Sequence, residues 1–259
     1  MKMRFLIPAT LALAWLTCVP ASRAIPNQDV RVDWSPWHSG VGGEFSVQPG
    51  ADLAYLLNSY SPLTRNQDPA NNPSFQTFCV QLTVEYQPGD TMLGFLNNAR
   101  LPNGNALPQG VAWLYNQFAL GTLANYDYAN VVTPNFLSRN DSAAALQNTI
   151  WWLFGDTSDP GAGDIFRDQV LNYSAALSPA GNPLQWALAA NDPHFIPVEV
   201  LVTKYDPTQG GWGDAQTQNG YRQNFLARVP DSTATFGLLG FALVGVLVCH
   251  RRVRRAEVA

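Results

Sequence analysis

The sequence is poor in charged residues. Asp, Glu, Lys and Arg make up 13% of its 259 residues, which is about half of the share in an average soluble protein. Residues 25–228 contain eight basic residues against seventeen acidic ones. This deficit of positive charge argues against nucleic acid as a partner, because binding to a phosphate backbone needs lysine and arginine. Asn, Gln, Ser, Thr and aromatic residues are abundant instead, which suits an extracellular setting and contact with carbohydrate.

Common catalytic motifs are also missing. The chain has no G-x-S-x-G elbow, no phosphate-binding glycine loop and no dinucleotide fingerprint. His38 and His194 lie far apart and form no zinc motif such as H-E-x-x-H. A glycoside hydrolase needs two carboxylates a few ångströms apart. Glu44, Glu85 and Glu199 are candidates, but a sequence does not show such a pairing. We therefore predict a protein that is not an enzyme, with a secreted polysaccharide-acting hydrolase as the alternative.

The N-terminus has the pattern of an export signal. Lys2 and Arg4 precede an apolar stretch over residues 5–19, and the segment 21–24 offers small residues at the positions that a signal peptidase reads. We predict a signal peptide over residues 1–24, cleaved after Ala24. A lipoprotein anchored through Cys18 is the alternative, although no small residue comes just before that cysteine.

The last thirty residues carry three signals in a fixed order. A short motif at residues 229–232 is followed by an uncharged apolar run at 234–249 and a basic end at 250–255. In lipid, such a run satisfies its backbone only as a helix, with the arginines on the cytoplasmic side. Its sixteen residues at about 1.5 Å each reach roughly 24 Å, short of the ~30 Å hydrocarbon core. A short transmembrane helix of this kind fits a transient anchor better than a permanent one.

This order of signals resembles the PEP-CTERM sorting tail of exported bacterial proteins. Val229, Pro230 and Asp231 match the Val-Pro-acid motif of that family, with Asp in place of the commoner Glu and Ser232 in place of a second proline. The resemblance implies processing by an exosortase, a membrane-embedded, transpeptidase-like cysteine protease found mostly in Gram-negative bacteria that make exopolysaccharide or biofilm. Because of these two departures, the motif does not identify the bond that is cleaved. The alternative is an ordinary single-pass tail anchor.

Cysteine is scarce, with three residues in the whole chain. Cys18 lies in the predicted signal peptide and Cys249 in the predicted membrane helix. The predicted exported domain, residues 25–228, therefore keeps Cys79 alone and has no intramolecular disulfide. A single thiol in an oxidising compartment must be buried, used or tolerated.

Alternation of apolar and polar residues predicts the strands. The pattern favours strands at residues 44–48, 78–86 and 197–205, and residues 225–229 are either a further strand or a linker. Cys79 would share the less apolar face of its strand. Side chains on that face need a cover from another element if they are to be buried.

Helical spacing predicts a helical middle. Helices are expected at residues 110–126, 142–154 and 165–177, the last two capped by Asp141 and Asp164. The expected fold is therefore α+β, with a β-rich core, sandwich or barrel-like, and a helical insertion between its strands.

Two short motifs resemble those of bacterial thioester domains. The segment FCV around Cys79 matches an aromatic-Cys-aliphatic strand, and LQNTIW around Gln147 matches a hydrophobic-Gln-x-x-Ile-Trp helix. The resemblance covers roughly residues 75–154. It implies an internal thioester between the Cys79 sulfur and the Gln147 side-chain carbonyl, with Phe78 and Trp151 as shielding residues.

The chemistry of a thioester requires these residue types. A thiolate attacks a carboxamide, ammonia leaves, and the acyl group that results is far more electrophilic, so water must be excluded from it. Trp151 lies four residues after Gln147, on the same side of a helix, and can cover the bond. An incoming amine or hydroxyl would then be acylated by Gln147. The alternatives are Cys79 buried as a small hydrophobic residue beside a surface Gln147, and a free regulatory thiol.

A loop rich in Gly and Pro contains several aspartates. Asp156, Asp159, Asp164 and Asp168 offer the hard oxygen ligands that Ca²⁺ prefers, but without EF-hand spacing. Helix capping, turn formation and solvent exposure explain the same residues. We predict no metal and no other cofactor, and keep the first three as weak calcium candidates.

These features predict an exported cell-surface or extracellular-matrix protein. Its expected processing enzymes are a signal peptidase and an exosortase-type enzyme, and the tail would hold it at the inner membrane until it is processed. Adhesion would follow from a Cys79–Gln147 thioester that reacts with a surface amine or hydroxyl, or from association with extracellular polysaccharide. A non-covalent carbohydrate-binding protein is a further alternative.

Overall fold

The computed structural model describes residues 28–39, 42–68, 70–84, 87–129, 138–177, 180–205 and 220–230. The predicted signal peptide and the predicted transmembrane helix lie outside these residues. Within the described ranges, no helix combines the length and the apolar character that a membrane span requires.

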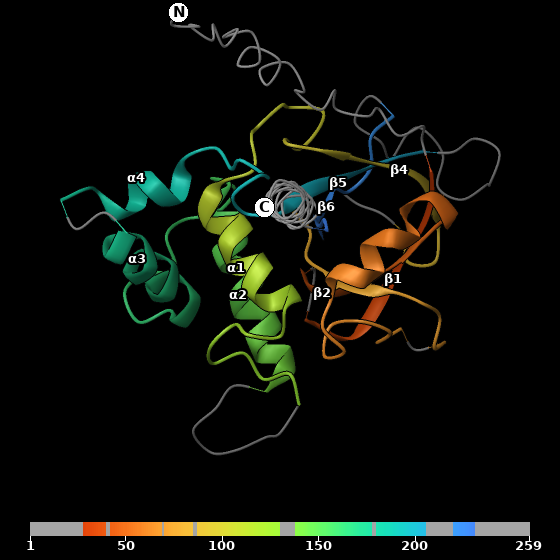
Figure 1. The fold of residues 1–259 in the computed structure, drawn as a ribbon, viewed down its shortest axis with the longest axis horizontal. Helices are drawn as coiled ribbons and strands as arrows, with labels where there is room; N and C mark the ends of the chain where they lie inside the picture. The colour runs from red at the N-terminus through yellow and green to blue at the C-terminus, as the bar shows by residue number, and fades with distance from the viewer. Residues whose placement is uncertain are drawn as a thin grey trace, which may run out of the picture.

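In the part of the chain that the structure describes, six antiparallel strands form one sheet (Figure 1). Their order across the sheet is β3-β2-β1-β4-β5-β6. The strands are β1 (Gln28–Ser39), β2 (Gly42–Pro49), β3 (Phe75–Thr77), β4 (Thr91–Asn97), β5 (Val198–Lys204) and β6 (Phe225–Arg228). The strands predicted at 44–48 and 197–205 are confirmed as β2 and β5, and the segment 225–229 is a strand, β6.

The two edges of this sheet meet, which nearly closes it into a barrel. The Leu226 N–H donates to the Phe78 carbonyl at 3.2 Å, and the Val80 N–H donates to the Asn224 carbonyl at 3.0 Å. These bonds join β6 to the chain that continues from β3, and we call this contact the seam. Cys79 lies in the seam, between the two bonds. The predicted α+β class is confirmed, and of the two expected architectures the barrel-like one is found.

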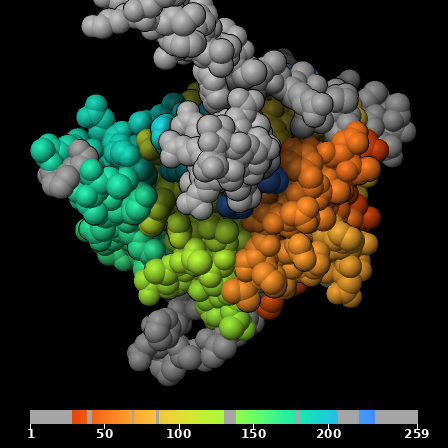
Figure 2. Space-filling model, in the orientation of Figure 1, coloured from red at the N-terminus to blue at the C-terminus, as the bar shows by residue number. Residues whose placement is uncertain are grey.

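The α-helices lie to one side of β1 and β2, and a 3-10 helix, in orange, lies against these two strands (Figure 1). These helices are the 3-10 helix η1 (Ala51–Ser59) and the α-helices α1 (Gln109–Ala119), α2 (Arg139–Leu153), α3 (Ile165–Leu177) and α4 (Pro183–Leu188). Helix α2 packs on β1 and β2, α1 packs on β5 and β6, and α3 and α4 pack on each other. In the space-filling view, α1 and α2 lie between the α3–α4 region, in teal, and the β1–β2 and η1 region, in orange (Figure 2).

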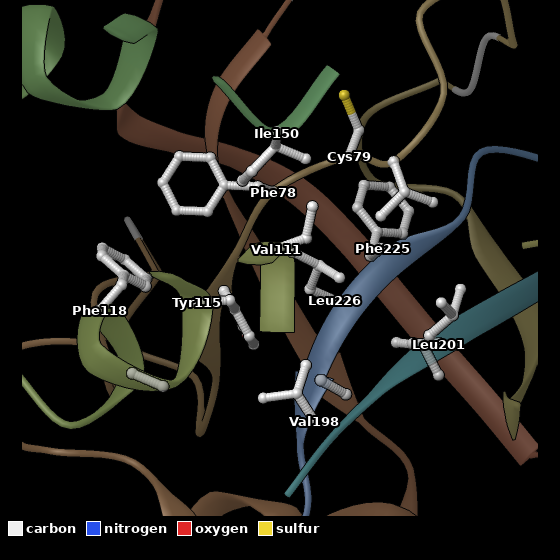
Figure 3. Packing of buried hydrophobic residues seen from close by; sticks show 14 of the residues in the cluster. Phe78, Cys79, Val111, Tyr115, Phe118, Ile150, Val198, Leu201, Phe225 and Leu226 are labelled. Atoms are coloured by element: carbon white, nitrogen blue, oxygen red, sulfur yellow. The ribbon is translucent and has the colours of Figure 1, made fainter. Parts of the chain in front are cut away.

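The core lies between α1, α2 and the sheet. Val111, Leu114, Tyr115 and Phe118, spaced at three and four residues along α1, are all fully buried, which is the pattern of a helix with one apolar face. In Figure 3, Cys79 lies at the edge of this cluster, and its sulfur points away from Val111 and Leu226. The sulfur is buried, but it does not point into the apolar cluster.

The three predicted helices are present, but the first one ends at Ala119 and not at residue 126, because Gly121 takes a left-handed conformation just after it. One of the predicted caps is also wrong. Asp164 caps α3, because its carboxylate accepts the N–H groups of Phe166 and Arg167. The cap of α2 is Ser138, three residues earlier than predicted, and Asp141 completes a capping box with it. Asp141 lies near the N-terminus of α2 whether it is the cap or a first-turn residue, and an acid is favourable there in both cases. The sequence pattern therefore fits a cap at Ser138 as well as one at Asp141.

The strand predicted over residues 78–86 is wrong in its described part. β3 ends at Thr77, and residues 80–84 form no strand. Side chains satisfy this backbone in place of a neighbouring strand: the Val80 carbonyl accepts from Arg100, and the Gln81 carbonyl accepts from Gln223. The sequence placed Cys79 on the less apolar face of a strand, but the residue is buried, with 3% of its surface accessible.

Candidate functional site

Gln147 is a polar side chain on the buried side of α2. It is 1% exposed, and its neighbours Leu146 and Ile150 are fully buried in the core. A buried carboxamide is stable only where its oxygen and its N–H groups find partners. Among the described residues, the hydrogen-bond partners of Gln147 all belong to Cys79, which the seam holds opposite α2.

Three contacts join the two residues. The Cys79 backbone N–H donates to Gln147 Oε1 at 3.2 Å, and Gln147 Nε2 donates to the Cys79 carbonyl at 2.8 Å. The third contact joins Cys79 Sγ to Gln147 Oε1 at 3.4 Å. The backbone of Cys79 thus fixes the orientation of the carboxamide and places its carbonyl beside the sulfur. The structure brings together the two residues that the sequence paired from 68 positions apart.

Burial keeps the thiol neutral. Loss of solvent raises the pKa of Cys79 to about 12, and a smaller effect of the Trp151 side chain lowers it. A free thiolate is therefore scarce at neutral pH. The S–H group points to Oε1, the atom on which negative charge would develop if Sγ attacked the carboxamide. The Cys79 N–H already donates to that same oxygen, as a donor in an oxyanion hole does.

The two predicted shielding residues are both buried. Phe78 is fully buried and packs edge-on against Phe118, with ring centroids 4.9 Å apart, whereas Trp151 is 5% exposed. Phe78 thus belongs to the core beneath Cys79. Trp151 is on the same helix face as Gln147, where it covers the carboxamide from the side of β2.

Gly42, at the start of β2, completes the cover and was not predicted. A Cβ at this position would lie 2.6 Å from Gln147 Cγ and 2.7 Å from Trp151 Cη2. Only a residue without a side chain allows β2 to approach both groups this closely. The sequence gives no sign of this role, because a glycine between strands more often marks a turn.

Arg100 is a second residue that the sequence did not indicate. Its guanidinium donates to the Val80 carbonyl at 2.7 Å, forms an ion pair with Asp156, and lies 4.8 Å from the centroid of the Phe154 ring. Asp156 also accepts from the Leu82 N–H at 3.4 Å. Arg100 therefore ties the chain after Cys79 to the end of α2, which fixes the distance between the two candidate residues.

The candidate calcium ligands have other partners. Asp156 pairs with Arg100, Asp159 pairs with Arg167 at 2.6 Å, and Asp164 caps α3. Across the described part of the chain, no group of three or more potential ligand side chains is close enough to hold a metal ion. The loop aspartates serve ion pairs and helix capping.

Glu44, one of the carboxylates considered for a hydrolase, is fully buried. It forms an ion pair with Arg139 at 2.7 Å and accepts a hydrogen bond from the Tyr126 hydroxyl. Burial raises its pKa, and Arg139 acts in the opposite direction. Glu44 thus connects β2 to the first turn of α2. Glu85 lies outside the described residues.

The predicted sorting residues are described only in part. Val229 and Pro230 follow β6, and the Val229 N–H donates to the Pro197 carbonyl at 2.9 Å. Asp231 and the predicted cleavage site after Ala24 lie outside the described residues.

Comparison with known proteins gives no relative for this chain. No protein-family model matches it, and no curated protein and no solved structure has a significant match to it. The function of this chain must therefore be inferred from its own residues and their geometry.

Proposed function

We propose that this protein attaches itself covalently to a partner through an internal thioester between Cys79 and Gln147. The observation that supports this most is the clamped carboxamide, whose carbonyl oxygen lies 3.4 Å from Cys79 Sγ and accepts the Cys79 N–H. A carboxamide held for structure alone does not need a thiol beside its carbonyl. Burial of both residues supplies the dry setting that a reactive acyl group needs.

The bond would form in one balanced exchange. Sγ attacks Cδ of Gln147, charge develops on Oε1, and the Cδ–Nε2 bond breaks. The amide nitrogen leaves as ammonia and takes the thiol proton with it. The Cys79 N–H stabilises the oxygen throughout, and the Cys79 carbonyl accepts from the departing nitrogen.

The second step transfers the acyl group to a partner. A primary amine or a hydroxyl attacks Cδ, the C–S bond breaks, and the nucleophile's proton goes to the sulfur, which restores the thiol. The Cys79 carbonyl, free after ammonia has left, accepts a hydrogen bond from the incoming N–H or O–H. An amine gives a stable amide at Gln147, and a hydroxyl gives an ester.

The setting that we propose is the cell surface or the extracellular matrix of a Gram-negative bacterium. The export signal, the transient membrane helix and the Val229–Pro230–Asp231 motif support processing by signal peptidase and an exosortase-type enzyme. The nucleophile would then be a surface amine or hydroxyl or a polysaccharide. Mass-spectrometric mapping of the C-terminus of the exported protein tests the processing step. A C-terminus near residue 231 supports it, and an intact C-terminal Ala259 contradicts it.

Methylamine tests the reactive bond. The full chain, purified in detergent, is incubated with methylamine and digested, and the peptide that contains Gln147 is examined for an N-methylamide. We expect the adduct in the natural sequence, and none after Cys79→Ala or Gln147→Glu. An adduct that persists after Cys79→Ala, or one that is absent from all three proteins, contradicts the proposal.

A further inference from the structure

In the described part of the chain, the indole N–H of Trp151 is a buried donor that is not paired with an acceptor. The residue is 5% exposed, and its Nε1 makes no hydrogen bond of ordinary geometry among the described residues. Buried donors are nearly always paired, so one that is not requires an explanation. Trp is an N–H donor only, so the missing partner must be an acceptor.

Trp151 is placed beside the candidate bond by two elements. It follows Gln147 by one helical turn of α2, and Gly42 of β2 packs closely against both side chains. Its side chain also lowers the pKa of the Cys79 thiol, against the larger opposing effect of burial. The indole therefore interacts more favourably with the sulfur when the sulfur is an anion.

We propose that the Trp151 N–H is the donor that stabilises the Cys79 sulfur as it leaves during acyl transfer, a role that rests on the proposed thioester. A neutral thiol and a thioester sulfur are weak acceptors. A thiolate accepts a charge-assisted hydrogen bond, which is roughly twice as strong as a neutral one. An interaction that strengthens only as charge builds on the sulfur lowers the barrier without stabilising the resting state.

The step balances without a further reagent. The amine attacks Cδ of Gln147, and the C–S bond breaks with its electron pair going to Sγ. Trp151 donates a hydrogen bond to Sγ but keeps its proton. The amine nitrogen becomes positively charged as it bonds to Cδ and then loses a proton to the sulfur, so the products are the amide and the thiol.

The direction in which the rate of adduct formation changes distinguishes a hydrogen-bonding role of Trp151 from a shielding role. In the full chain, Trp151→Phe keeps an aromatic cover and removes the N–H. Formation of the methylamine adduct should slow by roughly tenfold, which corresponds to about 1.4 kcal/mol of lost stabilisation of the leaving sulfur. If Trp151 acts only as a cover, the smaller ring gives the amine equal or better access. An adduct rate that is unchanged or faster overturns the proposal.

Trp152→Phe is the matched control. Trp152 is the next residue on α2 and contacts the Arg167 guanidinium, 5.6 Å from its ring centroid, on another side of the helix. Its replacement should leave the adduct rate unchanged. A slowing equal to that of Trp151→Phe would mean that loss of helix packing explains both, and the proposal would fail.

A second measurement does not depend on the thioester. In a Gln147→Ala background, Cys79 stays a thiol, and its rate of reaction with methyl methanethiosulfonate at pH 8 reports the thiolate fraction. Adding Trp151→Phe should lower this rate roughly tenfold, and an equal or higher rate overturns the contact between the indole and the sulfur. If the natural sequence forms no methylamine adduct while this rate still falls, the proposed function is wrong and the contact is real.

Discussion

Cys79 and Gln147 show how a polar residue comes to be buried in a core. Gln147 has the position of an apolar residue on α2, and its three polar contacts all go to Cys79. The motifs FCV and LQNTIW predicted this pair. The roles of Gly42 and Arg100 could not be predicted. Gly42 lets β2 come close to Gln147 and Trp151, and the long side chain of Arg100 reaches Val80 and Asp156. Such contacts leave no local pattern in a sequence.

Gly42→Ala tests the cover at the residue scale. The added methyl group would overlap Gln147 and Trp151, and we expect a loss of about 1–3 kcal/mol of unfolding free energy from overpacking. The fraction of molecules that form the methylamine adduct should fall with it. Urea unfolding and mass spectrometry give the two values.

Gly94→Ala is the control for that change. Its Cβ would crowd Val30 and Leu201 at 2.8 and 3.2 Å, within the sheet and away from Gln147. It should cost similar stability and leave the adduct fraction of the folded protein unchanged. Equal losses of adduct in both variants would show that Gly42 has no special place at the site.

At the scale of elements, the helices followed from the sequence better than the strands. A helix such as α1 buries every third or fourth residue, and that period is local. β1 contains Pro36, and its register with β2 shifts between Trp34 and His38, which interrupts the alternation. β4 carries Gly94 among apolar residues because β1 and β5 leave no room for a side chain there. Neither strand therefore shows the simple period of two.

Ser138→Ala tests the start of α2. The hydroxyl of Ser138 accepts the Asp141 N–H, and the Asp141 carboxylate accepts the Ser138 N–H. Removing the hydroxyl should lower the unfolding free energy by about 0.5–2 kcal/mol. Ser138→Thr keeps an oxygen in the cap and should recover most of it. Urea unfolding of the three proteins checks this order, and a Thr variant as unstable as the Ala variant would contradict the capping role.

At the scale of the whole molecule, the same seam contacts shape the sheet and position Cys79 in the candidate site. β6 is the last described strand, and its pairing with the chain after β3 both nearly closes the sheet into a barrel and holds Cys79 opposite α2. The seam joins segments that are about 150 residues apart, so no local pattern predicts it. The predicted strand over 78–86 failed for this reason: the residues after Cys79 look like a strand but bond to side chains.

Thr77→Val tests the seam. The Thr77 hydroxyl donates to the Leu226 carbonyl at 2.6 Å and accepts the Leu226 N–H at 3.1 Å. Valine has the same shape without the hydrogen bonds, and a buried carbonyl left unpaired costs about 1–3 kcal/mol. We expect this loss in urea unfolding, together with a lower adduct fraction in the molecules that remain folded.

Thr64→Val is the matched control, because Thr64 is also fully buried and its hydroxyl donates to the Ala119 carbonyl at 2.7 Å and not to a residue of the seam. It should cost stability but leave the adduct fraction unchanged. If both valine variants keep the full adduct fraction, the seam does not position Cys79.

The most direct test of the central claim is the intact mass of the freshly purified protein. The account predicts a mass lower by one ammonia than the sequence requires, in a form whose Cys79 resists alkylation after denaturation. Cys79→Ala should show the full calculated mass. A natural sequence that shows its full mass, with Cys79 freely alkylated once unfolded and glutamine rather than glutamate at position 147, would contradict the thioester.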